Sequence, residues 1–302
     1  MREYLDLVNH VIENGIEKEN RTGTNTLMSF GYHYKVDLNK GFPLLTTKKV
    51  FFNSVVHELL WYLSGETHIR NLRKHTKIWD AWTSEEKNWE IGKMYGYQWV
   101  KWEKYSENNI TGKTNKTYIN QIQDVIDLIK NNPDSRRMVV TAWNPSVLNE
   151  IALPSCHAFF IFNVTNGKLN CHLTQRSGDI ALGIPFNLAC YATLTQMIAQ
   201  ETKLELGEFS HYINDAHIYV NHIDGMRQQL EREPYELPQL VNVIKGDMRF
   251  IGPRPEIPEF VDRDSFSFLE KIKPGLSGYS SILFRNESEI WSMIDSEDPY
   301  LE

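Results

Sequence analysis

The pattern of hydrophobic and polar positions predicts a mixture of helices and strands in the first 237 residues. Apolar residues either recur at helical spacing or form continuous apolar runs in four segments, about Tyr4–Gly15, Val55–Leu63, Ile119–Lys130 and Leu188–Glu201. Strand patterns cover Leu27–Val36, Val139–Trp143, Ala158–Val164 and Lys168–Thr174. Because helices and strands are mixed rather than strictly alternating, the pattern predicts an α+β fold with a mixed or largely antiparallel sheet covered by helices.

Turn residues punctuate this pattern. Asn131-Asn132-Pro133 ends the third helical segment, since proline cannot continue a helix. Asn166-Gly167 separates the last two strand patterns and is typical of a tight hairpin. Arg21-Thr22-Gly23-Thr24 indicates a turn before the first strand.

The composition changes at Pro238. From Pro238 to Glu302 there are seven basic and twelve acidic residues and six of the twelve prolines. A segment of this length is marginal for an independent core, whereas residues 1–237 suit one large domain. The sequence therefore predicts a domain over 1–237 and an appended segment over 238–302.

Overall composition narrows the class of protein. The 302 residues carry a net charge of −7, and no apolar run reaches the roughly 20 residues of a membrane-spanning helix. The start, Met1–Asp6, lacks the features of a signal peptide. The three cysteines include no Cys-x-x-Cys pair, so they do not make a disulfide framework or a Cys-rich zinc site. We expect a cytoplasmic protein. Its negative charge argues against non-specific nucleic-acid binding, although RNA binding at a local basic patch stays open.

Several polar residues are candidates for catalysis or ligand binding. Cys156 lies at the start of a predicted strand, although a lone cysteine is more often a small buried apolar residue. The pair Arg136-Arg137 suits an anion, or else a solvated surface. Gln175-Arg176-Ser177 closes a predicted strand, and a guanidinium near a thiol lowers the pKa of that thiol.

Three further positions have two interpretations each. Asn187 precedes the last helical run, so it is either a helix cap or an amide suited to the edge of uracil. Glu58 lies inside an apolar helix, where burial raises a carboxyl pKa into the range useful for proton transfer. Asp215, His217 and Tyr219 share one strand face, and a metal site with nearby Asn221 and His222 is the weaker alternative.

Ten motifs, in this order, resemble thymidylate synthase over about Tyr4 to Leu237. They are Arg21-Thr22-Gly23-Thr24, Phe42-Pro43-Leu44-Leu45-Thr46-Thr47-Lys48, His57-Glu58-Leu59-Leu60-Trp61, Ile78-Trp79-Asp80, Tyr95-Gly96, Asp134-Ser135-Arg136-Arg137, Cys156-His157, Gln175-Arg176-Ser177, Leu182-Gly183-Ile184-Pro185-Phe186-Asn187 and Asp215-Ala216-His217-Ile218-Tyr219. The resemblance implies the synthase fold, a homodimer, and methylation of dUMP to dTMP with 5,10-methylenetetrahydrofolate as co-substrate and no metal.

The resemblance also implies a role for each matching residue, with Cys156 adding to C6 of the pyrimidine. The implied catalytic residues are Cys156, Glu58, Arg176, Asn187, Tyr95, His157 and Asp179. Those implied to bind dUMP are Arg21, Gln175, Arg176, Ser177, Asn187, His217 and Tyr219, with Arg136 and Arg137 serving the other subunit's site. Those implied to bind folate are Ile78, Trp79, Asp179, Leu182, Gly183 and Phe186.

The chain departs from the family pattern in three places. Ser155 stands where proline usually precedes the nucleophile, and Thr174 stands where an aromatic residue is common. The third departure is the C-terminal segment, where the family's ribose-binding tyrosine and closing tail are not found. The sequence from Leu237 instead resembles the second half of bacterial sugar transferases that act on polyprenyl phosphate.

The appended segment is expected to be non-catalytic. Sugar transferases use an Asp-Glu pair at the position of Tyr235-Glu236, so the nucleophilic aspartate is missing. Gly252-Pro253-Arg254-Pro255 stays a candidate phosphate-binding motif. Because the family's closing tail is replaced, two alternatives to methylation stay open. They are hydroxymethylation of a pyrimidine nucleotide in the same fold, and a nucleotide-binding dimer with impaired turnover.

Overall fold

A computed structural model describes residues 1–107, 114–237, 249–251 and 275–277. The chain divides into two units, Met1–Pro238 and Gln239–Glu302. In the second unit, the described residues form two short parallel strands, β9 (Arg249–Ile251) and β10 (Gly275–Ser277). The candidate motif Gly252-Pro253-Arg254-Pro255 lies outside the described residues.

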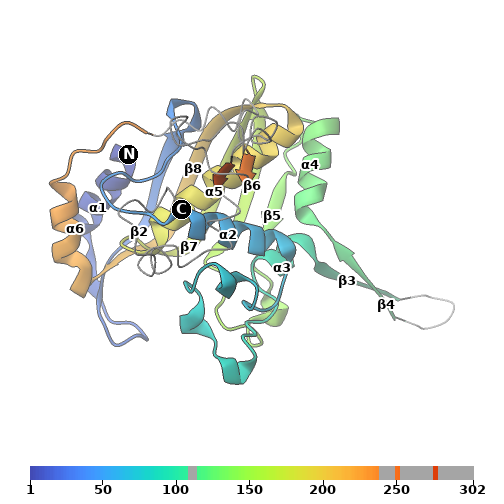
Figure 1. The fold of residues 1–302 in the computed structure, drawn as a ribbon, viewed down its shortest axis with the longest axis horizontal. Helices are drawn as coiled ribbons and strands as arrows, with labels where there is room; N and C mark the ends of the chain where they lie inside the picture. Colours follow the sequence, from blue (N-terminus) through green and yellow to red (C-terminus); the bar gives the residue numbers. More distant parts are fainter. Residues whose placement is uncertain (108–113, 238–248, 252–274, 278–302) are drawn as a thin grey trace, which may run out of the picture. The chain divides into compact units, whose positions relative to one another are not determined.

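A six-stranded mixed sheet forms the centre of the first unit (Figure 1). Its strands, in spatial order, are β1 (Ile16–Lys18), β2 (Thr26–Asp37), β8 (Glu205–Tyr219), β7 (Lys168–Asp179), β6 (His157–Thr165) and β5 (Val139–Thr141). All neighbours are antiparallel except β7 and β8, which run parallel. The mixed sheet confirms the α+β prediction.

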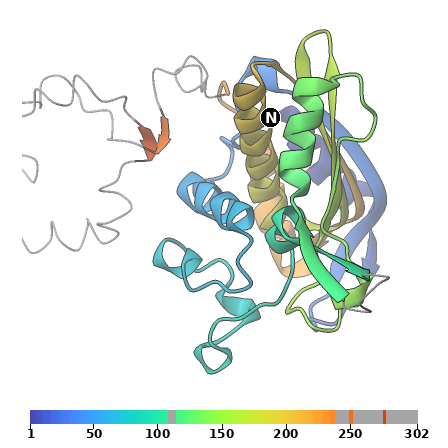
Figure 2. The same cartoon turned by 90° about the vertical axis from the view of Figure 1, so that its right-hand side faces the viewer.

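Helices cover one face of this sheet. They are α1 (Arg2–Asn14), α2 (Phe52–Ser64), α3 (Gly96–Val100), α4 (Gln121–Asn131), α5 (Gly183–Thr202) and α6 (Ile223–Leu230). Figure 2 shows α2, α4 and α5 on the same side of the strands. Among the described residues of the first unit, no helix lies over the opposite face.

The core lies between α5 and the sheet. Most residues of α5 are buried, as its nearly continuous apolar sequence predicts. The ring of Tyr191 on α5 packs against Trp99, Phe160 and Phe209, which come from α3 and two strands. This aromatic layer holds α5 against the sheet.

Three strands named here differ from the sequence predictions. β7 continues to Asp179, five residues beyond the predicted end, because its parallel pairing with β8 extends to Asp179 and His217. Gln175-Arg176-Ser177 therefore lies within a strand and not at its end. The pattern also missed the hairpin of β3 (Trp102–Glu107) and β4 (Thr114–Ile119), whose residues are mostly exposed and show no apolar face.

Candidate active site

A pocket of about 660 Å³ opens where β7 and β8 end. Because parallel strands end at the same edge, side chains that are distant in sequence meet there. From the sequence-predicted residues, the pocket brings together Arg21, Cys156, Arg176, Ser177, Asp179, His217 and Tyr219. Cations, a thiol and hydroxyl donors thus line one cavity, which suits a small anionic ligand.

Arg176 holds the backbone that carries the thiol. Its Nε donates to the Ser155 carbonyl at 3.0 Å, and its Nη2 donates to the Pro154 carbonyl at 2.6 Å. The backbone N–H of Arg176 also donates to the Cys156 carbonyl at 2.9 Å. On the other side, the Cys156 N–H donates to the Tyr95 hydroxyl at 2.8 Å. The Cys156 backbone is therefore fixed from two directions.

The pKa of the Cys156 thiol is raised above its ordinary value. Burial is the largest cause, and the charges of Arg176 and Arg21 together with a hydrogen bond from Tyr95 oppose it. The sequence-based expectation of a lowered thiol pKa is therefore wrong for this structure, although Arg176 acts in the expected direction. The cost of burying the thiolate exceeds the stabilisation that Arg176 supplies.

Asn187 lies inside α5, five residues into the helix. The residue at the N-cap position is Leu182, so the alternative interpretation of Asn187 as a cap is wrong. The Asn187 Oδ1 accepts a hydrogen bond from Gln175 Nε2 at 3.0 Å, and Gln175 Oε1 pairs with His211 Nε2 at 2.9 Å. These buried polar partners fix the orientation of the Asn187 amide.

His217 and Tyr219 lie on one face of β8, as the alternation predicts. Asp215 Oδ1 lies 2.8 Å from His217 Nδ1, and Lys18 Nζ lies 3.6 Å from Asp215 Oδ2. The hydrogen bond to His217 is the main cause that lowers the pKa of Asp215. In the part of the chain that the structure describes, no group of three or more His, Cys, Asp or Glu side chains is placed to hold a metal ion.

Glu58 is a buried carboxylate on α2. The indole Nε1 of Trp79 donates to its Oε1 at 2.7 Å, and burial raises its pKa to about 7. This confirms the expected direction. The Trp79 ring contacts Tyr95, whose ring contacts His157, with centroids 5.8 and 5.2 Å apart. Burial lowers the pKa of His157 to about 4, so its imidazole is neutral at pH 7. A row of contacts therefore runs from Glu58 to the residue beside the thiol.

The raised pKa of Glu58 makes stability depend on pH. The protonated form is favoured in the folded protein, so stability falls as pH rises from the ordinary carboxyl pKa of 4.5 through about 7. Glu58→Gln keeps an acceptor for Trp79 and has no proton to lose. We expect it to raise the free energy of unfolding by about 1 to 3 kcal/mol at pH 8.5 and to leave it nearly unchanged at pH 4.

Urea unfolding at both pH values checks this expectation. Glu205→Gln, at an exposed carboxylate, is the matched control and should show no such pH dependence. Equal destabilisation by Glu58→Gln at both pH values would show that the carboxylate is stabilised by its surroundings and not strained by burial.

Comparison with known families shows which family this chain belongs to. A family model described as thymidylate synthase matches residues 2–251, and one described as bacterial sugar transferase matches residues 231–302. The first match covers most of the chain. This chain belongs to the thymidylate synthase family. Both parts of the resemblance seen in the sequence are thus confirmed, and the family indicates a methyltransferase that binds dUMP and uses methylenetetrahydrofolate as co-substrate.

The two matches overlap over residues 231–251. The synthase match therefore runs past Leu237, where the sequence analysis ended it. Among the described residues, no helix combines the length and the apolar composition needed to cross a bilayer.

The residues that the synthase resemblance assigns to folate come from the segment after α2, the end of β7 and the start of α5. Asp179 lines the pocket, and its Oδ1 accepts hydrogen bonds from the N–H groups of Ala181 and Leu182. Leu182 is 56% exposed and Ile78 is 39% exposed, so both are accessible to a ligand. Gly183 begins α5 and Phe186 is half-buried in its first turn. A carboxylate next to accessible apolar side chains suits a flat heterocycle with polar edges.

Arg136 and Arg137 lie away from this pocket within the chain. Both are exposed, in the segment between α4 and β5, and neither lines the cavity. The single chain thus assembles the thiol, Arg21 and Arg176, but not the arginine pair.

The sequence analysis missed several residues that line this pocket. Lys18 reaches it from the edge strand, and no motif indicated this. Trp82 and Trp143 pack against the two arginines of the pocket. The guanidinium carbon of Arg21 lies 5.6 Å from the ring centroid of Trp82, and that of Arg176 lies 5.6 Å from the ring centroid of Trp143. Sequence features indicated a role for these two tryptophans only weakly, since Trp82 merely follows the motif Ile78-Trp79-Asp80 and Trp143 ends a predicted strand.

Proposed function

We propose that this protein is a thymidylate synthase that converts dUMP to dTMP with 5,10-methylenetetrahydrofolate, through addition of Cys156 to C6 of the pyrimidine. The observation that carries the proposal is the pocket in which Cys156 lies with Arg21, Arg176 and Ser177. A nucleophile within reach of a phosphate-binding group is what a reaction on the base of a nucleoside monophosphate requires.

We assign a separate partner to each part of dUMP; of these partners, Asn187 and Gln175 do not themselves line the pocket. Arg21, Arg176 and Ser177 supply cationic and hydroxyl donors for the phosphate. His217 and Tyr219 face the ribose, with His217 oriented by Asp215. Asn187 and its partner Gln175 present an amide to the uracil edge, which has one donor at N3 and one acceptor at O4. Binding the nucleotide at both ends places C6 at the thiol.

The protein groups around the thiol activate it and move protons. The Cys156 sulfur forms a bond to C6 and makes C5 nucleophilic; Arg176 and the Tyr95 hydroxyl stabilise the thiolate. Glu58, with a pKa of about 7, gives up or takes a proton near neutral pH and serves O4 and C5 through water. Neutral His157 completes the polar surroundings. Methylenetetrahydrofolate supplies the one-carbon unit and the hydride.

We assign folate binding to residues in the segment after α2, at the end of β7 and at the start of α5. Asp179 accepts hydrogen bonds at the pterin edge, while Ile78, Trp79, Leu182 and Phe186 provide apolar contacts and Gly183 permits close approach. Ile78 and Leu182 are both accessible enough to contact a ligand.

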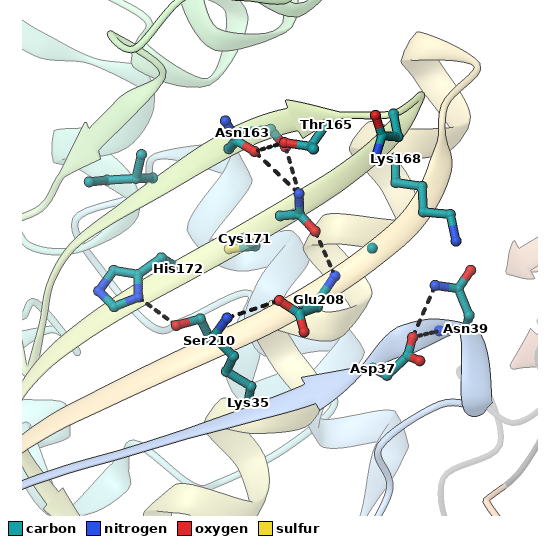
Figure 3. A pocket seen from close by; sticks show the side chains of 14 residues that line it. Lys35, Asp37, Asn39, Asn163, Thr165, Lys168, Cys171, His172, Glu208 and Ser210 are labelled. Atoms are coloured by element: carbon teal, nitrogen blue, oxygen red, sulfur yellow. Dashed lines mark hydrogen bonds and ion pairs between the residues drawn. The ribbon is translucent and has the colours of Figure 1, made fainter.

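We also propose a homodimer formed through the helix-free face of the sheet. Ile161, His172 and Ser210 alternate along their strands with residues buried in the core, so they point away from the helices. A pocket of about 660 Å³ lies on this face, where Lys35 pairs with Glu208 and His172 is hydrogen-bonded to Ser210 (Figure 3). A second copy over this face would bring its exposed Arg136 and Arg137 to the phosphate-binding end of the site.

Mixed dimers test this arrangement. In a dimer of one Cys156→Ser subunit and one subunit carrying Arg136→Glu and Arg137→Glu, one site has both defects and the other has neither. Each variant alone is expected to be nearly inactive. Equimolar mixing with subunit exchange is expected to restore about a quarter of wild-type activity, because half of the dimers are mixed.

Two tags of different size establish exchange in the same samples. Exchange without recovery of activity would show that the arginine pair does not serve the partner's site.

Two alternatives differ in their products. If water reaches the activated nucleotide because closure is incomplete, hydroxymethylation gives a hydroxymethyl nucleotide and tetrahydrofolate. If turnover is impaired, dUMP binds and neither folate product appears. Mass spectrometry of the nucleotide after reaction with methylenetetrahydrofolate separates these outcomes, and we expect dTMP.

The sugar-transferase-like segment is proposed to be non-catalytic. Tyr235 and Glu236, which stand at the positions of the transferase Asp-Glu pair, are exposed, and the Tyr235 N–H donates to the Thr46 hydroxyl at 2.9 Å. Neither side chain replaces the missing nucleophilic aspartate.

A further inference from the structure

Ser155 is a buried hydroxyl that the proposed mechanism does not use. It directly precedes Cys156, at a position where the synthase pattern usually has proline, and it is 1% exposed. Its Oγ accepts a hydrogen bond from the backbone N–H of Tyr95, with 3.3 Å between the heavy atoms. A proline side chain has no acceptor for this N–H group.

The backbone at Tyr95 is strained. Its φ of 35° and ψ of −105° lie outside the regions that a tyrosine prefers, and such a conformation is unfavourable for a non-glycine residue. The next residue, Gly96, packs directly against α2, because a Cβ there would lie only 1.8 Å from the Tyr62 carbonyl oxygen. Tyr95 therefore has to turn sharply beside α2, and it persists in this conformation only where its surroundings hold it.

The other end of Tyr95 meets the thiol residue. Its hydroxyl accepts the Cys156 N–H at 2.8 Å, and a hydrogen bond from this hydroxyl acts to lower the pKa of the Cys156 thiol. The adjacent residues Ser155 and Cys156 thus contact the two ends of the same tyrosine. Arg176 fixes the carbonyls of this dipeptide from the opposite side.

We propose that Ser155 is a positioning residue, whose hydroxyl holds the strained backbone of Tyr95 so that the phenol stays on Cys156. The position of the phenol is thereby set from both ends and not by ring packing alone. The effect on turnover rests on the proposed function, whereas the effect on the thiol does not, since it concerns only contacts among Ser155, Tyr95 and Cys156.

The test measures the rate of Cys156 alkylation by iodoacetamide as a function of pH, without nucleotide or folate. Ser155→Ala is expected to raise the midpoint of the profile by about 0.5 to 1 pH unit, as the loss of one hydrogen bond would. Tyr95→Phe is expected to raise it at least as much. In the Tyr95→Phe background, Ser155→Ala is expected to add nothing, because the phenol through which it acts is gone.

Two further variants complete the design. Ser155→Thr keeps the hydroxyl and is expected to restore most of the wild-type profile, and Ser146→Ala removes an exposed hydroxyl outside the site and is expected to leave it unchanged. The proposal is overturned if Ser155→Ala leaves the midpoint unchanged, or if its shift is the same with and without the Tyr95 hydroxyl. Circular dichroism and thermal melting establish that each variant is folded.

Turnover gives a second readout. If the protein makes dTMP, Ser155→Ala is expected to lower kcat about fivefold to tenfold and to change the KM for dUMP less than twofold, since dUMP contacts are intact. A change in KM alone would contradict a positioning role. If wild-type protein shows no turnover, the proposed function fails while the alkylation profiles still decide the role of Ser155.

Discussion

Cys156→Ser is expected to lower turnover of dUMP by at least about a thousandfold while changing dUMP affinity less than about twofold. A serine hydroxyl is much less acidic than a thiol, so Arg176 and Tyr95 cannot generate a useful anion from it. The phosphate and ribose contacts, which are made by other residues, stay in place. Steady-state rates and calorimetric titration with dUMP measure the two effects separately.

Cys171→Ser is the matched control for this variant. Cys171 is buried on β7, away from the pocket that holds Cys156, so the same chemical change there should leave kcat nearly unchanged. Full activity of Cys156→Ser would contradict the assignment of the nucleophile. An equal loss in both variants would point to a general effect on folding.

Asn187→Asp is expected to shift the ratio of kcat/KM for dUMP over dCMP by about tenfold to a hundredfold toward dCMP. Uracil presents a donor at N3 and an acceptor at O4, which an amide satisfies, whereas cytosine presents an acceptor at N3 and an amino group. One bidentate contact of this kind is worth about 1 to 3 kcal/mol of discrimination. Rates with both nucleotides at several concentrations give the ratio.

Asn187→Ala separates reading of the base from the structural role of Asn187. It removes the contact with Gln175 as well as any contact with the base, so it should weaken use of dUMP without creating a preference for dCMP. If Asn187→Asp also leaves the preference unchanged, Asn187 acts through Gln175 alone and does not read the base.

The helices of this protein were largely predictable because their signals are local. The run ending at Asn131-Asn132-Pro133 corresponds to α4 (Gln121–Asn131), within about two residues at either end. The apolar run of α5 was also evident, although the helix begins at Gly183, before the run becomes continuously apolar. Helical periodicity and turn signals involve residues that are close in sequence, so they can be recognised without knowing the fold.

The predictions that failed concern features that depend on contacts between residues distant in sequence. The extension of β7 to Asp179 arises from pairing with β8, and the location of Asn187 within a helix follows from that helix starting early. The direction of the Cys156 pKa shift also depends on how deeply the fold buries the thiol, which no motif states. The β3–β4 hairpin has no buried face, so its strands carry no alternating pattern.

Sequence motifs supplied several residues that line one pocket, but they did not indicate how those residues contact one another. Cys156 and Arg176, which come from two different motifs, both line that pocket. Nothing in the sequence indicated that Ser155 contacts Tyr95 or that Lys18 pairs with Asp215. These second contacts join residues 60 and 197 positions apart. They become visible only when the strands and α3 are placed in space.

The most direct test of the central claim follows the hydrogen at C5 of the nucleotide. Purified protein is mixed with dUMP carrying tritium at C5 and with methylenetetrahydrofolate, and released tritium, dTMP and dihydrofolate are measured together. Equal amounts of all three, with none formed by Cys156→Ser, are expected if Cys156 activates C5 for methylation. Tritium release by Cys156→Ser, or release in the wild-type protein without dTMP and dihydrofolate, would contradict the proposed reaction.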